Sequence, residues 1–412
     1  MSRRYEELDS LRGIAATSVV IHHCLITFSV FFAAYLHKDG SDEGWMNTIA
    51  NTPLHIFWAG HEAVILFFVL SGFVLTLALS KKTNYTSYAI GRICRIYIPY
   101  ILIIYLSILL LNVFVNNDYP DLSSWFNGMW AKELAFRDIV SYIFMFGHGS
   151  HNINTVTWSL VHEMRISLVF PLIVWIIYKL NWKASLLGGI AFCLFMSQFL
   201  AWLPGHLELS GMKDYLIKSF GNTFHYCSFF IMGAVLAKYR DKFGNVIRQL
   251  GISIKLMLAG LFVFLYTIEW WVPAFGELKR HASNMEKTTF TIVIDLLIGA
   301  SIIILFLLVM NTNSLSDFLQ KKPLVFLGKI SYSLYLIHPV VLLTSVNVLH
   351  GFLPLTLIVA SVPFTSIGMA AVMYYMVEKP AIKIGKRLSF AASGKKAVSR
   401  PIQNVKQEHV SN

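Results

Sequence analysis

Arg12 and His23 are the two residues of this chain whose types and spacing first suggest chemistry. They lie eleven positions apart in one largely apolar stretch. At about 100° and about 1.5 Å per residue, this spacing places both side chains on one face of a helix, about 16 Å apart. An ionisable imidazole inside an apolar span is costly and is by default a candidate functional group. The pair predicts a site for a long ligand, whose anionic head Arg12 binds at the inner surface and whose reactive end reaches His23 near the bilayer midplane.

His22 and His338 are two more histidines at the predicted depth of His23. Neighbouring residues on a helix point about 100° apart, so we expect only His23 to share the face of Arg12 and His22 to be a packed, hydrogen-bonded neighbour. His338 lies ten residues, about 15 Å, beyond Gly328 at the inner end of its own apolar stretch. At that depth His338 either forms an interhelical hydrogen bond or belongs to the site.

Arg92 and Arg95 lie three residues apart at the inner end of the third apolar stretch, hence on adjacent turns of one helix face. Guanidinium groups bind phosphate oxygens in a bidentate manner, so with Arg12 they could form a cationic mouth for phosphates. The alternative is that the two arginines only anchor the helix on the cytoplasmic side, as basic residues commonly do.

A second group of ionisable residues is expected near the outer surface. Glu163 follows Trp158 and His162 and lies about 7 Å below that surface in our interpretation, with Arg165 a further half-turn inside. Ionisable residues at that depth should pair with one another or line a wet cavity.

His61 and Glu62 enter the second apolar stretch from the same outer side. The small residues Ser71 and Gly72 follow them and allow another helix to approach closely. Asp295 stands alone in its apolar stretch, and we interpret it as a structural partner of other polar side chains.

The composition predicts an integral membrane protein. The 412 residues are 56% hydrophobic and 14% charged, with a mean hydropathy of +0.60, whereas soluble domains carry about 25% charged residues. An eight-residue apolar stretch, 139–146, is too short to cross, so we interpret it as re-entrant or interfacial. The predicted fold is an all-α bundle of about ten transmembrane helices. The ten stretches long enough for a hydrocarbon core of about 30 Å are residues 13–36, 58–79, 93–115, 158–178, 186–203, 219–237, 256–272, 290–310, 330–349 and 355–377.

The distribution of basic residues predicts the orientation. With the N-terminus inside, 25 of the 34 Lys and Arg residues fall on the cytoplasmic side and 8 on the outer side, as the positive-inside rule requires. Both termini are therefore expected to be cytoplasmic, in an inner (plasma) membrane. The net charge of +12 follows from the same bias, so we expect no nucleic-acid partner.

Few other features divide the chain. We expect one membrane domain over residues 1–388 and a disordered cytoplasmic tail over 389–412, because the tail is polar and poor in aromatic residues. The first apolar stretch follows several charged residues and is too long for a cleavable signal peptide. The four cysteines have no CxxC or metal-ligand spacing, so we expect neither disulfides nor a metal site.

Six short motifs, in this order, resemble those of the membrane-bound acyltransferase family 3, whose members O-acylate sugars and some other acceptors. They are residues 8–15 with His23, 67–73, 92–99, 158–160 with Glu163, 328–339 and 378–380. Each motif is weak alone, but six in register over nearly the whole chain are specific. The chain departs from the common pattern at Ile65, where an acid is frequent, although Glu62 lies one turn earlier on the same face. It also departs at His162 to Arg165, where two acids followed by aromatic residues are frequent.

The resemblance implies an enzyme that takes an acyl group from cytoplasmic acyl-CoA, its co-substrate, and delivers it to a hydroxyl on the far side of the membrane. It implies that Arg12 and His23 are the functional pair and that Arg92 and Arg95 are important for activity. The expected acceptor is a cell-surface or lipid-linked saccharide, as in polysaccharide O-acetylation. We expect acetyl-CoA as the donor, although the sequence itself does not distinguish acetyl from succinyl or longer groups.

The predicted mechanism combines these residues. The nucleotide of acyl-CoA docks against Arg12, Arg92 and Arg95, and the pantetheine arm carries the thioester toward His23. An apolar setting favours the neutral imidazole, so His23 can act as general base and take the proton of the acceptor hydroxyl. A transient acyl-histidine is the alternative. The remaining predicted site residues are Glu163, as a catalytic residue, and Glu62, Trp158, His162 and His338, which contact the acceptor.

Two other classes of protein remain open at this point. Intramembrane His, Glu and Arg side chains also relay protons in proton-coupled secondary transporters, but such proteins often contain inverted repeats, and we find no internal symmetry. A polysaccharide polymerase, or another protein that handles lipid-linked sugars, is the third class. Release of free CoA in the presence of acetyl-CoA and an acceptor would separate the enzyme from both.

Overall fold

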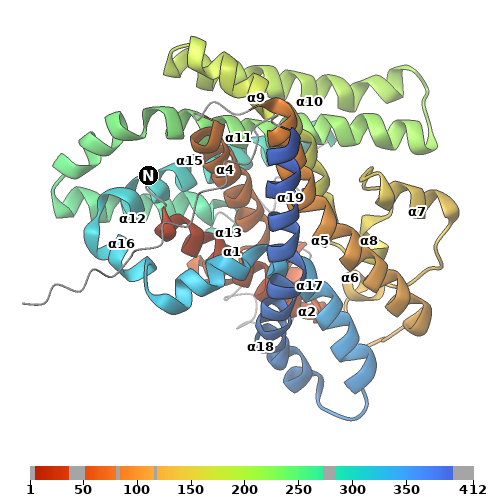
Figure 1. The fold of residues 1–412 in the computed structure, drawn as a ribbon. Coiled ribbons are helices and arrows are strands. Elements are labelled where there is room, and N and C mark those ends of the chain that lie inside the picture. Colours follow the sequence, from red (N-terminus) through yellow and green to blue (C-terminus); the bar gives the residue numbers. More distant parts are fainter. Residues whose placement is uncertain (1–4, 37–51, 80–83, 116–117, 272–283, 393–412) are drawn as a thin grey trace, which may run out of the picture.

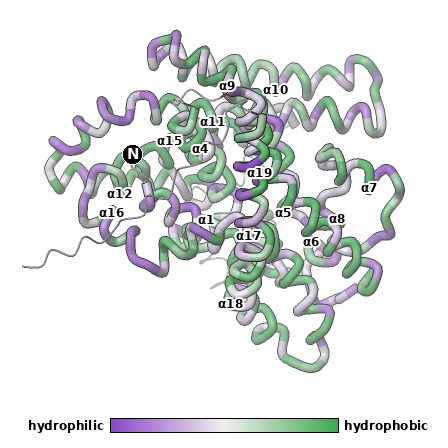
Figure 2. The backbone as a smooth tube through the Cα atoms, in the orientation of Figure 1, coloured by the Kyte–Doolittle hydropathy of each residue, from purple (hydrophilic) through white to green (hydrophobic). Residues whose placement is uncertain are grey.

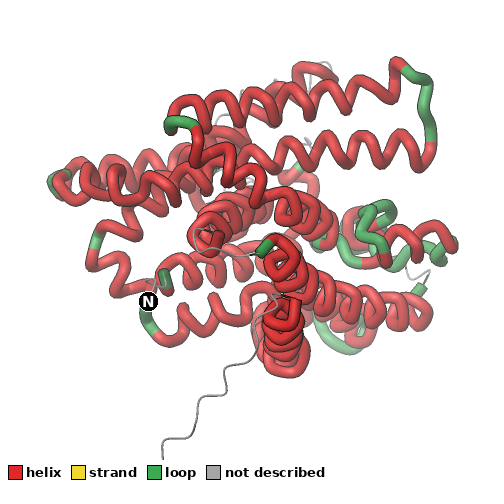
Figure 3. Tube along the Cα trace, turned by 45° about the horizontal axis from the view of Figure 1, so that its top comes forward, coloured by secondary structure: helices red, strands yellow, loops and turns green. Residues whose placement is uncertain are grey.

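The computed structural model describes residues 5–36, 52–79, 84–115, 118–271 and 284–392. Within these ranges the chain is almost entirely helical (Figure 3), and the only β-pairing is formed by two isolated bridges. Apolar residues predominate along most of the helices (Figure 2). The prediction of an all-α helical bundle is confirmed.

Each of the ten predicted membrane stretches falls on a helix or on two consecutive helices (Figure 1). In chain order these are α1 (Glu6–Ile26) with α2 (Ser29–Tyr35), η1 (Pro53–Trp58) with α4 (Gly60–Leu79), α5 (Tyr85–Phe114), α9 (Thr157–Lys179), η2 (Ala184–Gly188) with α10 (Gly189–His206), α11 (Gly211–Gln249), α12 (Ile252–Tyr266) with α13 (Ile268–Trp271), α15 (Asn284–Asn311), α17 (Lys322–Leu349) and α18 (Leu355–Met373). The other described helices are α6 (Ser124–Asn127), α7 (Phe136–Ile143), α8 (Ser150–Ile153), α16 (Asn313–Leu319), the π-helix η3 (Tyr374–Glu378) and α19 (Lys379–Ala392).

Seven helical segments in the described part of the chain are long and apolar enough to cross a membrane, so the chain is a multi-pass membrane protein. Three of the predicted stretches fall outside this set. The helices α1 and α11 contain several charged residues, and α12 is only 15 residues long. The count of ten crossings and the cytoplasmic placement of both termini therefore stay predictions.

The helix α5 begins eight residues before the predicted stretch, at Tyr85. The cause is local, because the side chain of Asn84 accepts a hydrogen bond from the backbone N–H of Thr86 and caps the helix. Arg92 consequently lies two turns inside α5 instead of at its end.

The eight-residue helix α7 lies beside the middle of α5. The hydroxyls of Tyr97 and Tyr100 donate hydrogen bonds to the carbonyl oxygens of Ile143, at 2.8 Å, and Tyr142, at 3.0 Å. A helix of this length measures about 12 Å, too short to cross a membrane. The prediction that the stretch 139–146 does not cross is confirmed.

The first predicted stretch, 13–36, is not one continuous helix. Phe28 adopts an extended backbone between α1 and α2 and forms an isolated bridge with Leu122. The hydroxyl of Ser123 also donates to the carbonyl oxygen of Ile26, at 2.6 Å. These backbone contacts end α1 and fix the segment 118–127 beside its outer end.

The helices α1 and α17 pack in parallel through two glycines. A Cβ atom added to Gly13 would meet the backbone of Leu327 and Gly328, and one added to Gly328 would overlap the carbonyl oxygen of Asp9. Ten residues further along both helices, His23 and His338 are hydrogen-bonded. The glycine contact therefore sets the register that brings the two histidines together.

A second close contact joins α4 and α11. A Cβ atom at Gly72 would overlap the carbonyl oxygen of Phe230, and one at Gly233 would overlap the carbonyl oxygen of Val69. This confirms that the pair of small residues at 71–72 allows a helix to approach closely.

We expect Gly233→Ala to lower the free energy of unfolding by about 1–3 kcal/mol, because the added methyl group meets backbone atoms that cannot rotate away. The matched control is Gly260→Ala in α12, where nothing lies within 4 Å of the added Cβ and alanine favours the helix. Thermal unfolding of both variants in one detergent tests the prediction, and equal midpoints would contradict it.

The helix α19 continues from α18 through η3 and lies against α5, as Figure 1 shows. The hydroxyls of Ser87 and Ser389 each donate to the other residue's carbonyl oxygen, at 2.7 Å. The helix ends at Ala392, four residues beyond the expected end of the membrane domain. The rest of the predicted tail lies outside the described residues.

Candidate active site

One cavity of about 950 Å³ lies between α1, α4, α5, α9, α17 and α19; we refer to it as the arginine cavity. Among the residues that line it are Arg12, Phe67, Phe68, Ser71, Arg92, Arg95, Ser159, Glu163, Tyr332, Tyr335 and Lys386. The three arginines come from two helices far apart in the sequence. The structure therefore brings together the three basic residues that the sequence analysis grouped.

The charge of this cavity is strongly positive. Its described lining residues include four basic side chains, those of Arg12, Arg92, Arg95 and Lys386, but only one carboxylate, Glu163. Such an excess attracts polyanions, and guanidinium groups are suited to phosphate oxygens.

Glu163 lies in the arginine cavity, whereas we expected it near the outer surface and far from Arg92. One oxygen of Glu163 lies 2.9 Å from Nη2 of Arg92, which also donates to Ser167 at 2.9 Å. The expectation was wrong because α5 begins early, which moves Arg92 inward, and because α9 starts beside the middle of α5. Glu163 thus neutralises and orients Arg92.

Arg165 and His162 have partners other than Glu163, so the three are not mutually paired. Glu163 and His162 instead line hollows, which is the other alternative that the sequence left open. Arg165 donates to the hydroxyls of Ser219, at 2.9 Å, and Thr223, at 3.2 Å. It also donates to the carbonyl oxygen of Phe146, at 3.2 Å. His162 Nδ1 lies 2.9 Å from the Thr223 hydroxyl. These contacts join α9, α11 and the loop before α8.

His23 and His338 form a hydrogen-bonded pair, with 2.8 Å between His23 Nδ1 and His338 Nε2. His338 Nδ1 lies 3.1 Å from the carbonyl oxygen of Leu334. A carbonyl only accepts, so in the neutral pair His338 carries its hydrogen on Nδ1 and accepts at Nε2. His23 must then donate from Nδ1, which leaves a lone pair on its Nε2. This is the tautomer that a general base needs.

The surroundings of His23 agree with the roles expected of its neighbours. His22 Nδ1 lies 3.0 Å from the carbonyl oxygen of Trp58, which confirms that His22 is a packed, hydrogen-bonded neighbour. The ring of Trp125 packs against that of His23 in a tilted arrangement, with ring centroids 4.8 Å apart. Neither His23 nor His338 lines the arginine cavity; Tyr335 does, and its ring centroid is 6.2 Å from that of His338.

A second, smaller hollow of about 290 Å³ lies between α9 and α11; we refer to it as the aromatic pocket. It is lined by Trp158, His162, Asp214, Tyr215, Lys218, Ser219, Asn222 and Tyr226. The two hollows lie on different faces of the same stretch of α9, because Ser159 faces the arginine cavity and its neighbour Trp158 faces the aromatic pocket. The rings of Phe68 and Tyr226, one from each hollow, are 4.8 Å apart.

The comparison with protein families decides the identity. The sequence model of acyltransferase family 3, described as an acyltransferase domain, matches residues 5–375, nearly the whole chain. The chain belongs to this acyltransferase family. It is also 24% identical over 241 residues to the O-acetyltransferase PaAT-1 of Phomopsis amygdali. The alignment covers 50% of the chain and 47% of that relative, so the chain spans about half its length. No solved structure matches.

Glu62 of the acyltransferase lines neither hollow, contrary to the predicted contact with a substrate. Its carboxylate is buried and accepts a hydrogen bond from the indole of Trp270, at 2.9 Å. Asp295 is equally buried and bridges His61, at 2.7 Å, and His225, at 2.8 Å. These are the contacts of a structural partner, because they join α4, α11 and α15.

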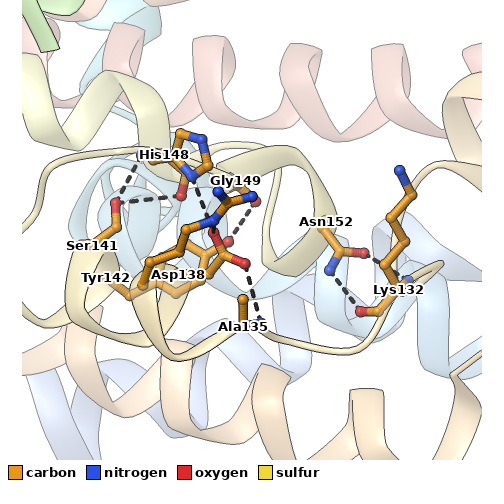
Figure 4. Close-up of polar contacts among 9 residues, drawn as sticks. Lys132, Ala135, Asp138, Ser141, Tyr142, His148, Gly149 and Asn152 are labelled. Atoms are coloured by element: carbon orange, nitrogen blue, oxygen red, sulfur yellow. Dashed lines mark hydrogen bonds and ion pairs between the residues drawn. The ribbon is translucent and has the colours of Figure 1, made fainter. Parts of the chain in front are cut away.

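Between α5 and α9 of the acyltransferase, Asp138 of α7 and His148 form a hydrogen bond of 3.0 Å (Figure 4). The hydroxyl of Tyr142 donates to the carbonyl oxygen of Gly149 in the same cluster. The ring of His148 packs edge-on against Tyr215 of the aromatic pocket, with centroids 5.0 Å apart. The loop thus supports one wall of that pocket.

Three lining or neighbouring residues escaped the sequence analysis. Lys386 was counted only as a topological charge, although α19 carries it to the arginine cavity. Tyr335, which lines the same cavity, was assigned no role. Glu378 accepts a hydrogen bond from Ser333 at 2.7 Å and is 3% exposed within η3. The available signal for Glu378 was its place in the last of the six motifs, residues 378–380.

Among the described residues, no group of three or more His, Cys, Asp or Glu side chains is arranged to hold a metal ion. The four cysteines are unpaired and buried.

Proposed function

We propose that this multi-pass acyltransferase moves an acyl group, acetyl in the first instance, from cytoplasmic acyl-CoA to a hydroxyl group. The observation that carries the proposal is the arginine cavity, in which Arg12, Arg92 and Arg95 converge beside the helix that holds His338 and, through it, His23. The match to an O-acetyltransferase supports a hydroxyl as the acceptor and acetyl as the group.

The donor binds by its anionic nucleotide. Its phosphates lie against Arg12, Arg92 and Arg95, and Lys386 adds a fourth positive charge at the same cavity. The extended pantetheine arm is comparable in length to the separation of about 16 Å between Arg12 and His23 on one helix. Acyl-CoA is thus a co-substrate, and the reaction uses no metal.

His23 acts as the general base. Its Nε2 lone pair takes the proton of the acceptor hydroxyl as the oxygen attacks the thioester carbonyl. His338 holds the ring by accepting from Nδ1, and it stabilises the imidazolium that forms. Glu163 acts on the donor side, because it orients Arg92. An acyl-histidine intermediate is the alternative course, and trapping of a labelled acyl group on His23 would reveal it.

The acceptor is a cell-surface or lipid-linked saccharide at an inner (plasma) membrane, and we place it at the aromatic pocket. Aromatic faces such as those of Trp158 and Tyr226 bind the apolar faces of sugar rings. His162 and Asn222 supply hydrogen-bonding groups beside them. The same stretch of α9 that lines this pocket also lines the arginine cavity from another face.

The function is tested with purified protein, acetyl-CoA and a glycan extract. We expect CoA release that depends on the extract, followed by acyl groups on the glycans in mass spectrometry of cells with and without the gene. Proton uptake by proteoliposomes without acetyl-CoA, and no CoA release, would instead favour a transporter.

We expect Trp158→Ala to raise the KM for the acceptor about tenfold, because a stacked aromatic contact is worth about 0.5–1.5 kcal/mol beyond its buried area. The KM for acetyl-CoA should not change, since Trp158 does not face the arginine cavity. Trp175→Ala is the matched control on the same helix, with a side chain that is 55% exposed. Equal acceptor KM values in the two variants would remove the acceptor from this pocket.

A further inference from the structure

Tyr335 connects the arginine cavity with the histidine pair, because its ring centroid lies 6.2 Å from that of His338. It lines the cavity, and on α17 it is three residues before His338, so the two side chains lie on adjacent turns of one face. The ring is held by an edge contact with Phe67, at 5.4 Å between centroids. Packing therefore fixes the position of this ring beside the cavity.

The hydroxyl of Tyr335 is a hydrogen-bond donor with a replaceable partner. Ser159 Oγ lies 2.7 Å from the Tyr335 hydroxyl and 3.0 Å from the carbonyl oxygen of Val156. The Tyr335 hydroxyl itself lies 3.4 Å from the same carbonyl oxygen. A carbonyl only accepts, and Ser159 makes the shorter contact with it, so Ser159 donates to Val156 and accepts from Tyr335. Ser159 also lines the cavity. A ligand carbonyl that arrives there can take its place as the acceptor.

Tyr332, one turn earlier on α17, shows the contrast. It also lines the arginine cavity, but its hydroxyl donates to the backbone carbonyl oxygen of Ile96, at 2.8 Å. This carbonyl belongs to the backbone of the helix α5, so it cannot rotate away as a side chain can. Of these two phenols at the cavity, Tyr335 is the one that can redirect its hydrogen bond from a side chain to a ligand.

We propose that Tyr335 is a catalytic residue that donates its hydroxyl hydrogen bond to the thioester carbonyl oxygen of the bound acyl-CoA. The inference rests on the function proposed above. Donors aimed at an oxygen that gains negative charge in the transition state commonly contribute a factor of about 10²–10³ in kcat. Tyr335 exchanges Ser159 for the carbonyl oxygen when the acyl group arrives, and it tightens this bond as charge develops.

The reaction balances without any other reactant. The acceptor oxygen forms a bond to the carbonyl carbon, its proton moves to His23 Nε2, and the carbonyl π electrons move onto the oxygen that Tyr335 binds. When this oxyanion collapses, the carbon–sulfur bond breaks and its electrons leave with the thiolate. The sulfur then takes the proton from His23, so both Tyr335 and His23 end as they began.

The test is the infrared carbonyl band of acetyl-CoA labelled with carbon-13 at the thioester carbonyl, bound to full-length protein in detergent. A hydrogen bond to the carbonyl lowers the frequency of this band. We expect a lower frequency in the wild type than in Tyr335→Phe, which keeps the ring and its packing. Tyr332→Phe and Ser159→Ala should keep the wild-type frequency, because neither removes the donor.

The outcomes separate this inference from the proposed function. Acetyl-CoA that does not bind to the wild type overturns the function itself. If acetyl-CoA binds to both the wild type and Tyr335→Phe and its carbonyl frequency is the same in the two, only the role of Tyr335 is overturned.

Kinetics give a second readout. Tyr335→Phe should lower the kcat of acyl transfer by about 10²-fold with little change in the KM for acetyl-CoA. A rise in KM at unchanged kcat would show that Tyr335 only shapes the cavity, and would overturn the inference.

Discussion

Replacement of His23 by Asn should reduce acyl transfer by at least about 10³-fold. General bases typically contribute about 10²–10⁴-fold. The amide nitrogen of Asn can replace Nδ1 as the donor to His338, but Asn has no counterpart of the Nε2 lone pair. The rate of CoA release with a saturating acceptor measures the effect.

His22→Asn is the matched control for this experiment. His22 uses only Nδ1, which faces the carbonyl oxygen of Trp58, and the Asn amide can supply that donor. We expect the control to retain turnover within a few fold and to unfold at nearly the same temperature. Turnover near the wild-type level in His23→Asn would remove the general base from the mechanism, because the hydrogen bond to His338 is retained.

Simultaneous replacement of Arg92 and Arg95 by Ala should raise the KM for acetyl-CoA about 10²-fold, with a smaller effect on kcat. Each hydrogen bond to a charged group contributes about 1.5–3 kcal/mol, and the double change removes two such donors. Arg12 and Lys386 remain at the cavity, so some binding persists. Initial rates over a range of acetyl-CoA concentrations give both constants.

Arg137→Ala is the control for the loss of an arginine, because this side chain is 72% exposed on α7 and lies outside the arginine cavity. Added salt should weaken donor binding to the wild type more than to the double variant, since screening acts on the phosphate contacts. An unchanged KM in the double variant would leave Arg92 and Arg95 as topological anchors only.

The helices were predictable because each is encoded in a local apolar stretch. The register between helices was not, because it depends on where each helix starts. Asn84 caps α5 two turns before Arg92. Because the helix starts there, Arg92 lies further inside it and reaches the depth of Glu163. Hydropathy alone placed these two residues on opposite sides of the membrane.

The histidine pair was the part of the site that the sequence predicted best. His23 and His338 were assigned equal depth from their distances to their helix starts, and the glycine contact between α1 and α17 keeps those starts level. Tyr335 and Lys386 could not be assigned in the same way. Nothing in a single sequence tells which of several phenols or basic residues faces a cavity formed by six helices.

The contact between α1 and α17 also has a consequence for biosynthesis. His338 is synthesised 315 residues after His23, which at about 5–20 residues per second takes roughly 15–60 s. Throughout that interval the first helix must reside in the translocation apparatus or the lipid with an unmatched imidazole and arginine. The histidine pair can therefore form only after most of the chain has been synthesised.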